Sequence, residues 1–341
     1  MVRMSIQPRP LQRNKQAELS RALQRAVRLH QQGDLDQAEN ICRAILATQP
    51  NHGDALHLLG IVRSQQGRND EALDCLVAAL KATPSNVVAW LNCGLVRAKL
   101  RHFEEALACY DRALALKPDF ATAFNNRGSI LRELNRHEEA LDSYDRALAL
   151  KSDYAEAFNN RGNTLRDLRR FEEALAAYES ALSFKPDYAD ALNNRGTALA
   201  DLNRPEEALE SYDRALALKP DYPEALNNRG NALRVLDRPE AALASYDKAL
   251  NLRPGYAEAN NNRGVALTDL KRFEEALASY DRALAIKHDY VDALNNRGSV
   301  LRELSRFEEA LTSYDRALAL KPELVEALSN RGRVLSTTLA V

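Results

Sequence analysis

The glycines of this chain recur at one fixed spacing. Nine of them follow each other at intervals of 34 residues without insertion or deletion: Gly60, Gly94, Gly128, Gly162, Gly196, Gly230, Gly264, Gly298 and Gly332. Such a period indicates one supersecondary unit copied end to end, in which each copy packs only on its neighbours. The spacing therefore predicts a solenoid.

Each copy contains two helical stretches. In this register nine complete copies cover residues 19–324, and a partial tenth with a first helix only covers residues 325–341. In the fifth copy AEAFNNRGNTLRDL precedes the turn residues Arg169 and Arg170, and FEEALAAYESALSF follows them. Apolar residues fall at helical spacing in both stretches. The sequence therefore predicts an all-α fold, and we expect residues 1–18 to be a disordered basic arm.

The pattern within a copy is specific. It resembles the tetratricopeptide repeat (TPR), and the copy at residues 87–120 shows this best, through Trp90, Gly94, Ala106, Tyr110, Ala113 and Pro118. The resemblance covers residues 19–341. It implies a right-handed superhelical solenoid of helix-turn-helix repeats that serves as a protein–protein interaction scaffold.

Composition narrows the class of protein. Hydrophobic residues make up 45% of the chain, yet no apolar run approaches the length of about 18 residues that a membrane helix needs. The basic start lacks the apolar stretch of a secretory signal. A net charge of -1 argues against a surface that tracks phosphates, and the near-constant repeats argue against a base-reading code. We expect a cytoplasmic protein that binds neither membrane nor nucleic acid.

Residue patterns that carry catalytic or metal chemistry are missing. The four cysteines form no CxxC pair, and the six histidines never show metal-ligand spacing. Acidic pairs such as Glu104-Glu105 begin second helices, where the helix dipole favours negative charge. We therefore predict no enzyme activity, no metal and no cofactor.

The motif NNRG is the informative departure from the TPR pattern. Asparagine costs on the order of 0.5 kcal/mol relative to alanine inside a helix, so two in succession need a reason. In TPR arrays the first helices line the concave surface, and the sixth repeat position faces it. A row of amides there offers donors and acceptors to the backbone of an extended peptide. The predicted binding residues are Asn92, Asn126, Asn160, Asn194, Asn228, Asn262, Asn296 and Asn330.

This row is similar to the asparagine-lined superhelix of O-linked N-acetylglucosamine transferases, including the bacterial SPINDLY-like ones. Two functions follow. The chain is an autonomous scaffold that binds extended polypeptide, or it is the substrate-recruiting arm of a larger enzyme of that kind, with the catalytic region absent from this chain. Recent duplication of the repeats is the alternative explanation of the asparagines. The first helix at the carboxyl end lacks a polar capping helix, so self-association through exposed solenoid ends is also expected as an alternative contact.

The arginine of NNRG has a predicted partner in the sequence. An acid stands 16 residues before each of these arginines, on the second helix of the preceding copy: Asp111, Asp145, Glu179, Asp213, Asp247, Asp281 and Asp315. Where the acid is missing the arginine is missing too, because Val77 precedes Cys93 and Arg43 precedes Leu59. We expect structural ion pairs between repeats, bidentate where the geometry allows.

Overall fold

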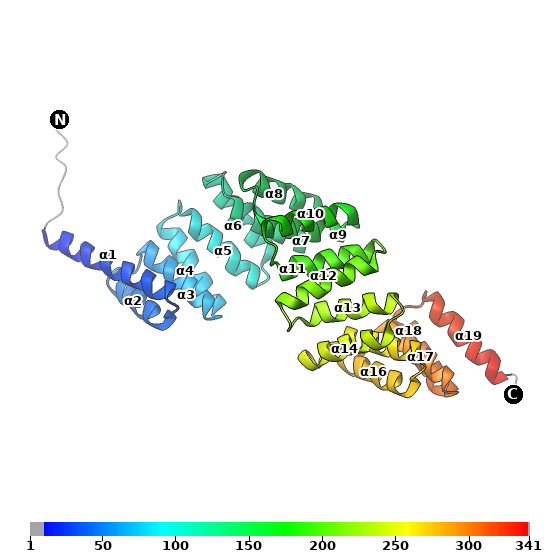
Figure 1. Ribbon diagram of the computed structural model, residues 1–341. Helices are drawn as coiled ribbons and strands as arrows, with labels where there is room; N and C mark the ends of the chain where they lie inside the picture. The colour runs from blue at the N-terminus through cyan, green and yellow to red at the C-terminus, as the bar shows by residue number, and fades with distance from the viewer. Residues whose placement is uncertain (1–9, 340–341) are drawn as a thin grey trace. The chain divides into compact units, whose positions relative to one another are not determined.

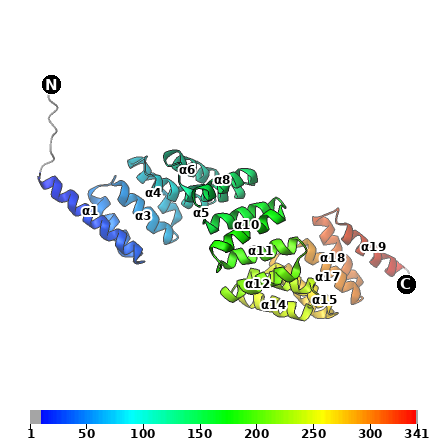
Figure 2. The same cartoon turned by 45° about the horizontal axis from the view of Figure 1, so that its top comes forward.

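The computed structural model describes residues 10–339, and all regular structure in that range is α-helical. The chain divides into two compact units, residues 1–168 and 169–341. Figures 1 and 2 colour their helices by residue number. The first unit contains α1 (Pro10–Gln31), α2 (Leu35–Thr48), α3 (Gly53–Gln65), α4 (Asn69–Ala82), α5 (Val87–Lys99), α6 (Phe103–Leu116), α7 (Ala121–Glu133), α8 (His137–Leu150) and α9 (Ala155–Asp167).

The second unit continues the same alternation of helices. It contains α10 (Phe171–Phe184), α11 (Ala189–Asp201), α12 (Pro205–Leu218), α13 (Pro223–Val235), α14 (Pro239–Leu252), α15 (Ala257–Asp269), α16 (Phe273–Ile286), α17 (Val291–Glu303), α18 (Phe307–Leu320) and α19 (Val325–Leu339). In both units consecutive helices pack against each other in chain order. The predicted all-α TPR solenoid is confirmed, while the right-handed sense of the superhelix stays a prediction.

The first helix of each repeat carries the odd number. Within each unit neighbouring first helices touch each other, as α3 and α5 do or α13 and α15, whereas neighbouring second helices make no such contact among the described residues. Within each unit, neighbouring repeats therefore lie closer together on the side of the first helices than on the side of the second helices. We call that side the inner face.

A buried tyrosine and a glycine build the core of each repeat. The tyrosine at the twenty-fourth position is fully buried in seven repeats: Tyr110, Tyr144, Tyr178, Tyr212, Tyr246, Tyr280 and Tyr314. A Cβ atom added to Gly94 would lie 2.5 Å from Cε1 of Tyr110, and the other described glycines that face such a tyrosine are equally close to it. In the repeats where glycine faces this tyrosine, the glycine is therefore a packing requirement, because the ring occupies the space of a side chain.

The turn between the two helices of a repeat uses a left-handed residue. Gly33 and Gly67 occupy this fifteenth position in the first two repeats, with φ of 83° and 81°. The later repeats place other residues in the same conformation: Arg101, Asn135, Arg169, Asn203, Asp237, Lys271 and Ser305. Left-handed backbone is costly for residues other than glycine, so this turn holds strain in most repeats.

The amino-terminal helix is longer than the repeat pattern predicts. Helix α1 begins at Pro10, so the prediction of disorder is wrong for residues 10–18, whereas residues 1–9 lie outside the described residues. Proline is favoured at the first position of a helix, and the following stretch LQRNKQAEL consists mainly of good helix formers. Leu19, which is buried, gives that helix a first anchor in the core.

Candidate functional site

The two asparagines of NNRG have different environments on the first helices. The asparagines at the fifth position are buried in six repeats: Asn125, Asn159, Asn193, Asn227, Asn261 and Asn295. The predicted binding residues at the sixth position are partly exposed, except Asn330, which is buried. In each of these six repeats the structure thus separates one inward amide from one amide at the surface of the inner face.

Hydrogen bonds join these amides across the repeat boundaries. The sixth-position amide donates from Nδ2 to Oδ1 of the fifth-position asparagine in the preceding repeat. The donor–acceptor distances are 3.1 Å for Asn160 to Asn125, 3.1 Å for Asn228 to Asn193, 3.0 Å for Asn262 to Asn227, 3.1 Å for Asn296 to Asn261 and 3.4 Å for Asn330 to Asn295. We call this series of bonds the amide ladder. It was not predicted from the sequence.

The ladder changes at its amino-terminal end. Nδ2 of Asn92 lies 2.9 Å from Nε2 of His57, which occupies the fifth position in its repeat. Burial lowers the pKa of His57 and outweighs the opposing charge of Asp54, so the neutral ring is the favoured form. If the amide donates here as it does elsewhere, Nε2 carries no proton. A neutral histidine then replaces the asparagine oxygen as acceptor.

The ladder leaves part of each surface amide unused. A carboxamide has two N–H donors and an oxygen with two lone pairs. Within the described residues, Oδ1 of Asn160, Asn228 and Asn296 accepts no hydrogen bond. In the alternate repeats Oδ1 of Asn126, Asn194 and Asn262 accepts one from the neighbouring asparagine, at 3.4, 3.3 and 3.3 Å. Alternate repeats therefore differ in the oxygen they present.

Pockets on the inner face contain three of the predicted residues. One pocket of about 220 Å³ lies in the first unit, lined by Ile61, Ser64, Gln65, Leu76, Asn92, Leu95, Val96 and Lys99. The same eight repeat positions line a pocket of about 250 Å³ in the second unit: Thr197, Ala200, Asp201, Tyr212, Asn228, Asn231, Ala232 and Val235, with Asn203 and Pro205 at its edge. Asn160 borders a third pocket, of about 450 Å³, beside Lys99, Arg101 and Arg132.

Some charged side chains on the inner face are paired between repeats. The residue at the twelfth position meets the residue at the thirteenth position of the next repeat. Nε of Arg132 lies 2.5 Å from Oδ2 of Asp167, and Nη1 of Arg234 lies 3.7 Å from Oδ2 of Asp269. Lys99 makes the equivalent contact by donating to Oγ of Ser64 at 2.9 Å. At these three repeat steps the charged side chain on the inner face therefore has a polar partner in the adjacent repeat.

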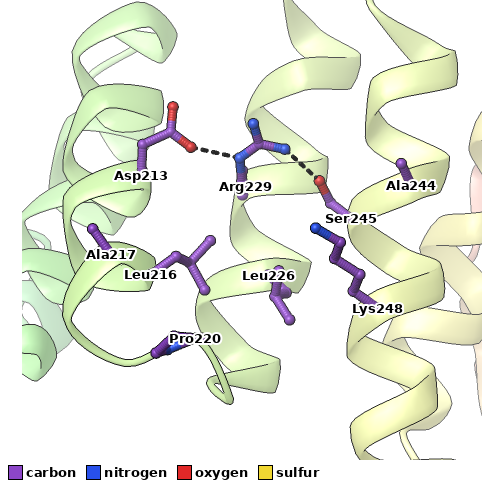
Figure 3. A pocket seen from close by; sticks show the side chains of 9 residues that line it. All are labelled: Asp213, Leu216, Ala217, Pro220, Leu226, Arg229, Ala244, Ser245 and Lys248. Carbon is purple, nitrogen blue, oxygen red and sulfur yellow. Dashed lines mark hydrogen bonds and ion pairs between the residues drawn. The ribbon is translucent and has the colours of Figure 1, made fainter.

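All seven predicted arginine pairs are confirmed. The nitrogen–oxygen distances are 2.6–2.7 Å in six of them and 3.4 Å for Arg195 and Glu179. Each is a single contact, and no bidentate pairing is seen among these described residues. The second nitrogen has another role: Nη1 of Arg229 donates to Ser245 at 2.7 Å (Figure 3). The guanidinium thus joins second helices of adjacent repeats through the first helix between them.

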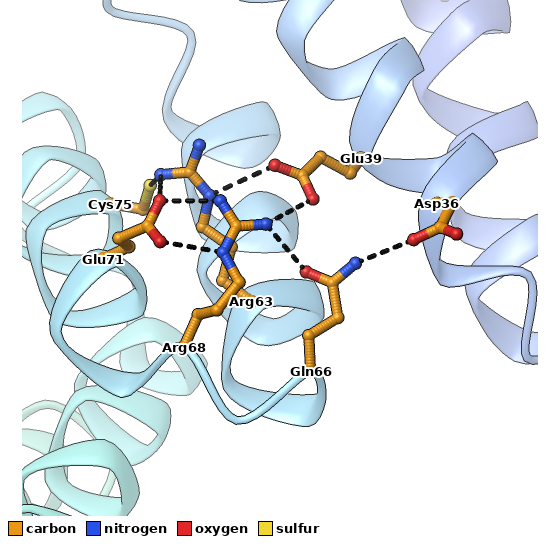
Figure 4. A network of polar contacts seen from close by, with 7 residues as sticks. All are labelled: Asp36, Glu39, Arg63, Gln66, Arg68, Glu71 and Cys75. Carbon is orange, nitrogen blue, oxygen red and sulfur yellow. Dashed lines mark hydrogen bonds and ion pairs between the residues drawn. The ribbon is translucent and has the colours of Figure 1, made fainter.

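A different network ties the first two repeats, where this pair is missing. Arg68 contacts the carboxylate of Glu71 with two nitrogens, at 2.8 and 2.6 Å, and Glu39 on α2 with a third, at 2.8 Å (Figure 4). Burial would raise the pKa of Glu39, but Arg68 and Arg63 hold it below its usual value. The buried carboxylate therefore stays ionised and links α2 to the second repeat.

The cysteines are packed inside the first three repeats. All four are buried and free: Cys42, Cys75, Cys93 and Cys109. Burial raises the pKa of Cys42 to about 11, which keeps its thiol protonated. Within residues 10–339 no group of histidine, cysteine and acidic side chains has the arrangement of a metal site. No helix in that range is apolar enough over a sufficient length to span a membrane.

Comparisons with known proteins agree with this architecture. Family models described as tetratricopeptide repeat match residues 29–92, 91–155, 159–223, 221–288 and 255–323. The chain belongs to the tetratricopeptide-repeat family, whose members generally serve as protein-interaction scaffolds. No curated protein matches the chain.

Many solved structures are similar to the chain. YrrB, described as a TPR protein with an unusual peptide-binding site, is 30% identical; the match covers 54% of this chain and 95% of YrrB, with a TM-score of 0.45. The APC/C hetero-tetramer Cut9–Hcn1 is 17% identical over 92% of this chain and 63% of that one, with a TM-score of 0.64. A TPR protein from Parabacteroides merdae is 18% identical over 73% and 98%, with a TM-score of 0.60. The last two show the fold alone.

Proposed function

We propose that the inner face binds polypeptide in an extended conformation through the sixth-position asparagines. The observation that carries this proposal is the amide ladder, which holds five of the sixth-position amides from the preceding repeat and leaves hydrogen-bonding capacity on several of them beside the pockets. An extended chain presents N–H and C=O groups along its length, and an amide can bind either. Binding through the backbone makes the surface tolerant of partner sequence.

Anchoring favours this function over a loose row of amides. A side chain that is already held loses less conformational entropy when a ligand arrives, and an immobilised side chain otherwise costs about 0.5–1.5 kcal/mol. Asn160, Asn228 and Asn296 combine an anchored Nδ2 with an open Oδ1. These three residues are the proposed centre of backbone recognition. The alternative role, as the recruiting arm of a larger O-GlcNAc-transferase-like enzyme, uses the same surface and stays a prediction.

The test compares two variants that differ only in the surface amides. N125L/N193L/N261L removes the anchors but keeps the sixth-position asparagines, and Leu91 already occupies the fifth position in its own repeat. Adding N160A/N228A/N296A removes three surface amides without leaving a buried oxygen unpaired. The probe is a fluorescent pool of random 15-residue peptides, and circular dichroism checks the fold.

We expect binding to weaken from the natural chain to the leucine variant, and at least tenfold further in the six-residue variant. The first step reports the loss of anchoring, and the second reports the loss of the amides themselves. Unchanged affinity of the six-residue variant would assign recognition to another surface.

A further inference from the structure

We propose that the pocket around Val235 receives an aliphatic side chain of the bound polypeptide. This inference rests on the proposed function and adds a preference for one residue type at one place on the inner face. The pocket lies in the second unit between α11 and α13, and Asn228 is one of the residues that line it.

Val235 is an apolar residue at a polar repeat position. Its exposed fraction is 60%, the second highest among the exposed large hydrophobic residues of the described chain. The other repeats have polar or charged residues at the same thirteenth position: Gln31, Gln65, Lys99, Glu133, Asp167, Asp201, Asp269 and Glu303. A single exposed valine is ordinary on a protein surface, so its setting decides its meaning.

The setting is a repeat step at which two facing positions are both apolar. Arg132 pairs with Asp167, and Lys99 bonds to Ser64, through the twelfth position of one repeat and the thirteenth of the next. At the same step between the sixth and seventh repeats the two residues are Ala200 and Val235. Both members of the polar pair are therefore apolar there, and neither leaves an unpaired charge behind. A short side chain and an exposed valine stand here in place of the polar contact that three other repeat steps make.

The lining of the pocket suits a branched aliphatic group. Ala232 and Tyr212, which line it, are almost fully buried, and Pro205 also lines it. Its volume of about 250 Å³ is confined to one repeat step. The equivalent pocket in the first unit has Lys99 where this one has Val235, so the repeat fold itself does not require an apolar wall.

The position relative to the amide ladder selects the occupant. Asn228 is anchored to Asn193 through Nδ2, and its Oδ1 is open, so a backbone N–H of an extended segment can bind at the edge of the pocket. Successive side chains of an extended segment point to opposite sides. A residue beside that N–H can therefore direct its side chain into the pocket, and leucine, isoleucine or valine would bury it against Val235, Ala200 and Ala232.

The experiment selects peptides from a random 12-residue phage library on purified full chain. Two variants close the pocket with polar pairs that the chain uses at other repeat steps. A200R/V235D reproduces the pair of Arg132 and Asp167, and A200S/V235K reproduces the pair of Ser64 and Lys99. The converse variant R132A/D167V builds the apolar pair at one step of the first unit. Circular dichroism and sedimentation check the fold and the oligomeric state of each variant.

We expect peptides selected on the natural chain to share an aliphatic position, which selection on either closed variant loses. Burial of one such side chain corresponds to roughly 10- to 150-fold in affinity, so a selected peptide should weaken by that factor on the closed variants. The same peptide with alanine at the aliphatic position should bind the natural chain and the closed variants alike. R132A/D167V should select peptides with an additional aliphatic position.

Three results would overturn the inference. Peptides selected without an aliphatic position, or equally on the closed variants, leave backbone recognition intact and remove the pocket preference. Loss of a dimer in the closed variants, with peptide selection unchanged, assigns the patch to self-association. Failure to enrich any peptide over an unrelated protein removes the proposed function as well.

Discussion

The amide ladder makes a quantitative prediction at Asn262. Its Nδ2 donates to Oδ1 of Asn227, whose side chain is completely buried. In N262A that oxygen loses its only donor from the next repeat. An unsatisfied buried acceptor costs about 1–3 kcal/mol, and the better helix propensity of alanine returns on the order of 0.5 kcal/mol. The expected net loss is about 0.5–2.5 kcal/mol.

Asn126 provides a matched control in the same chain. Like Asn262 it accepts a weak hydrogen bond from the asparagine before it, at 3.4 Å compared with 3.3 Å. The preceding repeat has Leu91 at the fifth position, so Asn126 has no ladder oxygen to donate to. N126A therefore removes everything that N262A removes except the bond between repeats. We expect N126A to be neutral or slightly stabilising.

Local hydrogen exchange is the suitable measurement, because repeat arrays do not always unfold as one cooperative unit. Protection of amides in α13 and α15 should fall about 2- to 60-fold in N262A, since 1.4 kcal/mol corresponds to a factor of ten. Protection of α5 and α7 should not fall in N126A. N227L/N262A should recover most of the loss, because it removes both polar partners. Equal protection in N262A and N126A would show that the ladder bond contributes nothing to stability.

Three further predictions follow from the same repeats. D213A should lower the free energy of unfolding by about 0.5–1 kcal/mol, because the pair of Asp213 and Arg229 is partly exposed. D213A/R229L should unfold at nearly the same urea concentration as the natural chain. A double variant that is less stable than D213A would contradict a purely pairwise role. Lys271→Gly should raise the free energy of unfolding by about 0.5 kcal/mol, and the thermal midpoint with it, because relief of the positive φ of 58° outweighs the entropy cost of glycine. A lower midpoint would refute strain at this turn. Burial lowers the pKa of His57, so the folded state binds the His57 proton less readily than the unfolded chain does. The contribution of His57 to the stability of the first unit is therefore complete above about pH 6.5 and falls as the pH drops below that value. Urea titrations at several pH values should show that His57→Asn removes this pH dependence.

The arginine pairs were predictable from the sequence because natural exceptions identify the partners. Val77 and Cys93 replace the acid and the arginine together, and so do Arg43 and Leu59. Loss of both members at once is the expected pattern for ionic partners, since one left alone gains nothing from the other. Pairing within a single repeat would have matched Cys93 with Asp111. These exceptions, together with the 16-residue separation, therefore predict that each contact lies between repeats.

The amide ladder was harder to predict because most repeats repeat both partners unchanged. From the fourth to the ninth repeat the fifth and sixth positions are always asparagine, so no variation shows which residue bonds to which. The residues that could have identified the partners lie in the divergent repeats. There His57, which is another hydrogen-bond acceptor, occupies the fifth position 35 residues before Asn92. The sequence placed the surface amides but did not indicate that half of the NNRG pair is buried. A helix period alone does not show how deeply a neighbouring helix covers each face.

The ladder and the arginine pairs join the same repeats from different sides of the first helix. The asparagines bond directly to the preceding first helix, whereas Arg229 reaches Asp213 and Ser245 on second helices (Figure 3). Removal of surface amides therefore leaves the ionic contacts that fix the repeat register, and removal of an ionic pair leaves the amides in place. Because additivity holds best for sites without shared partners, a loss of binding in the asparagine variants can be separated from a loss of repeat packing. If arginine-pair variants that retain full helicity also lost peptide binding, the two sets of contacts would be coupled, and the inner face would depend on repeat geometry as much as on its amides.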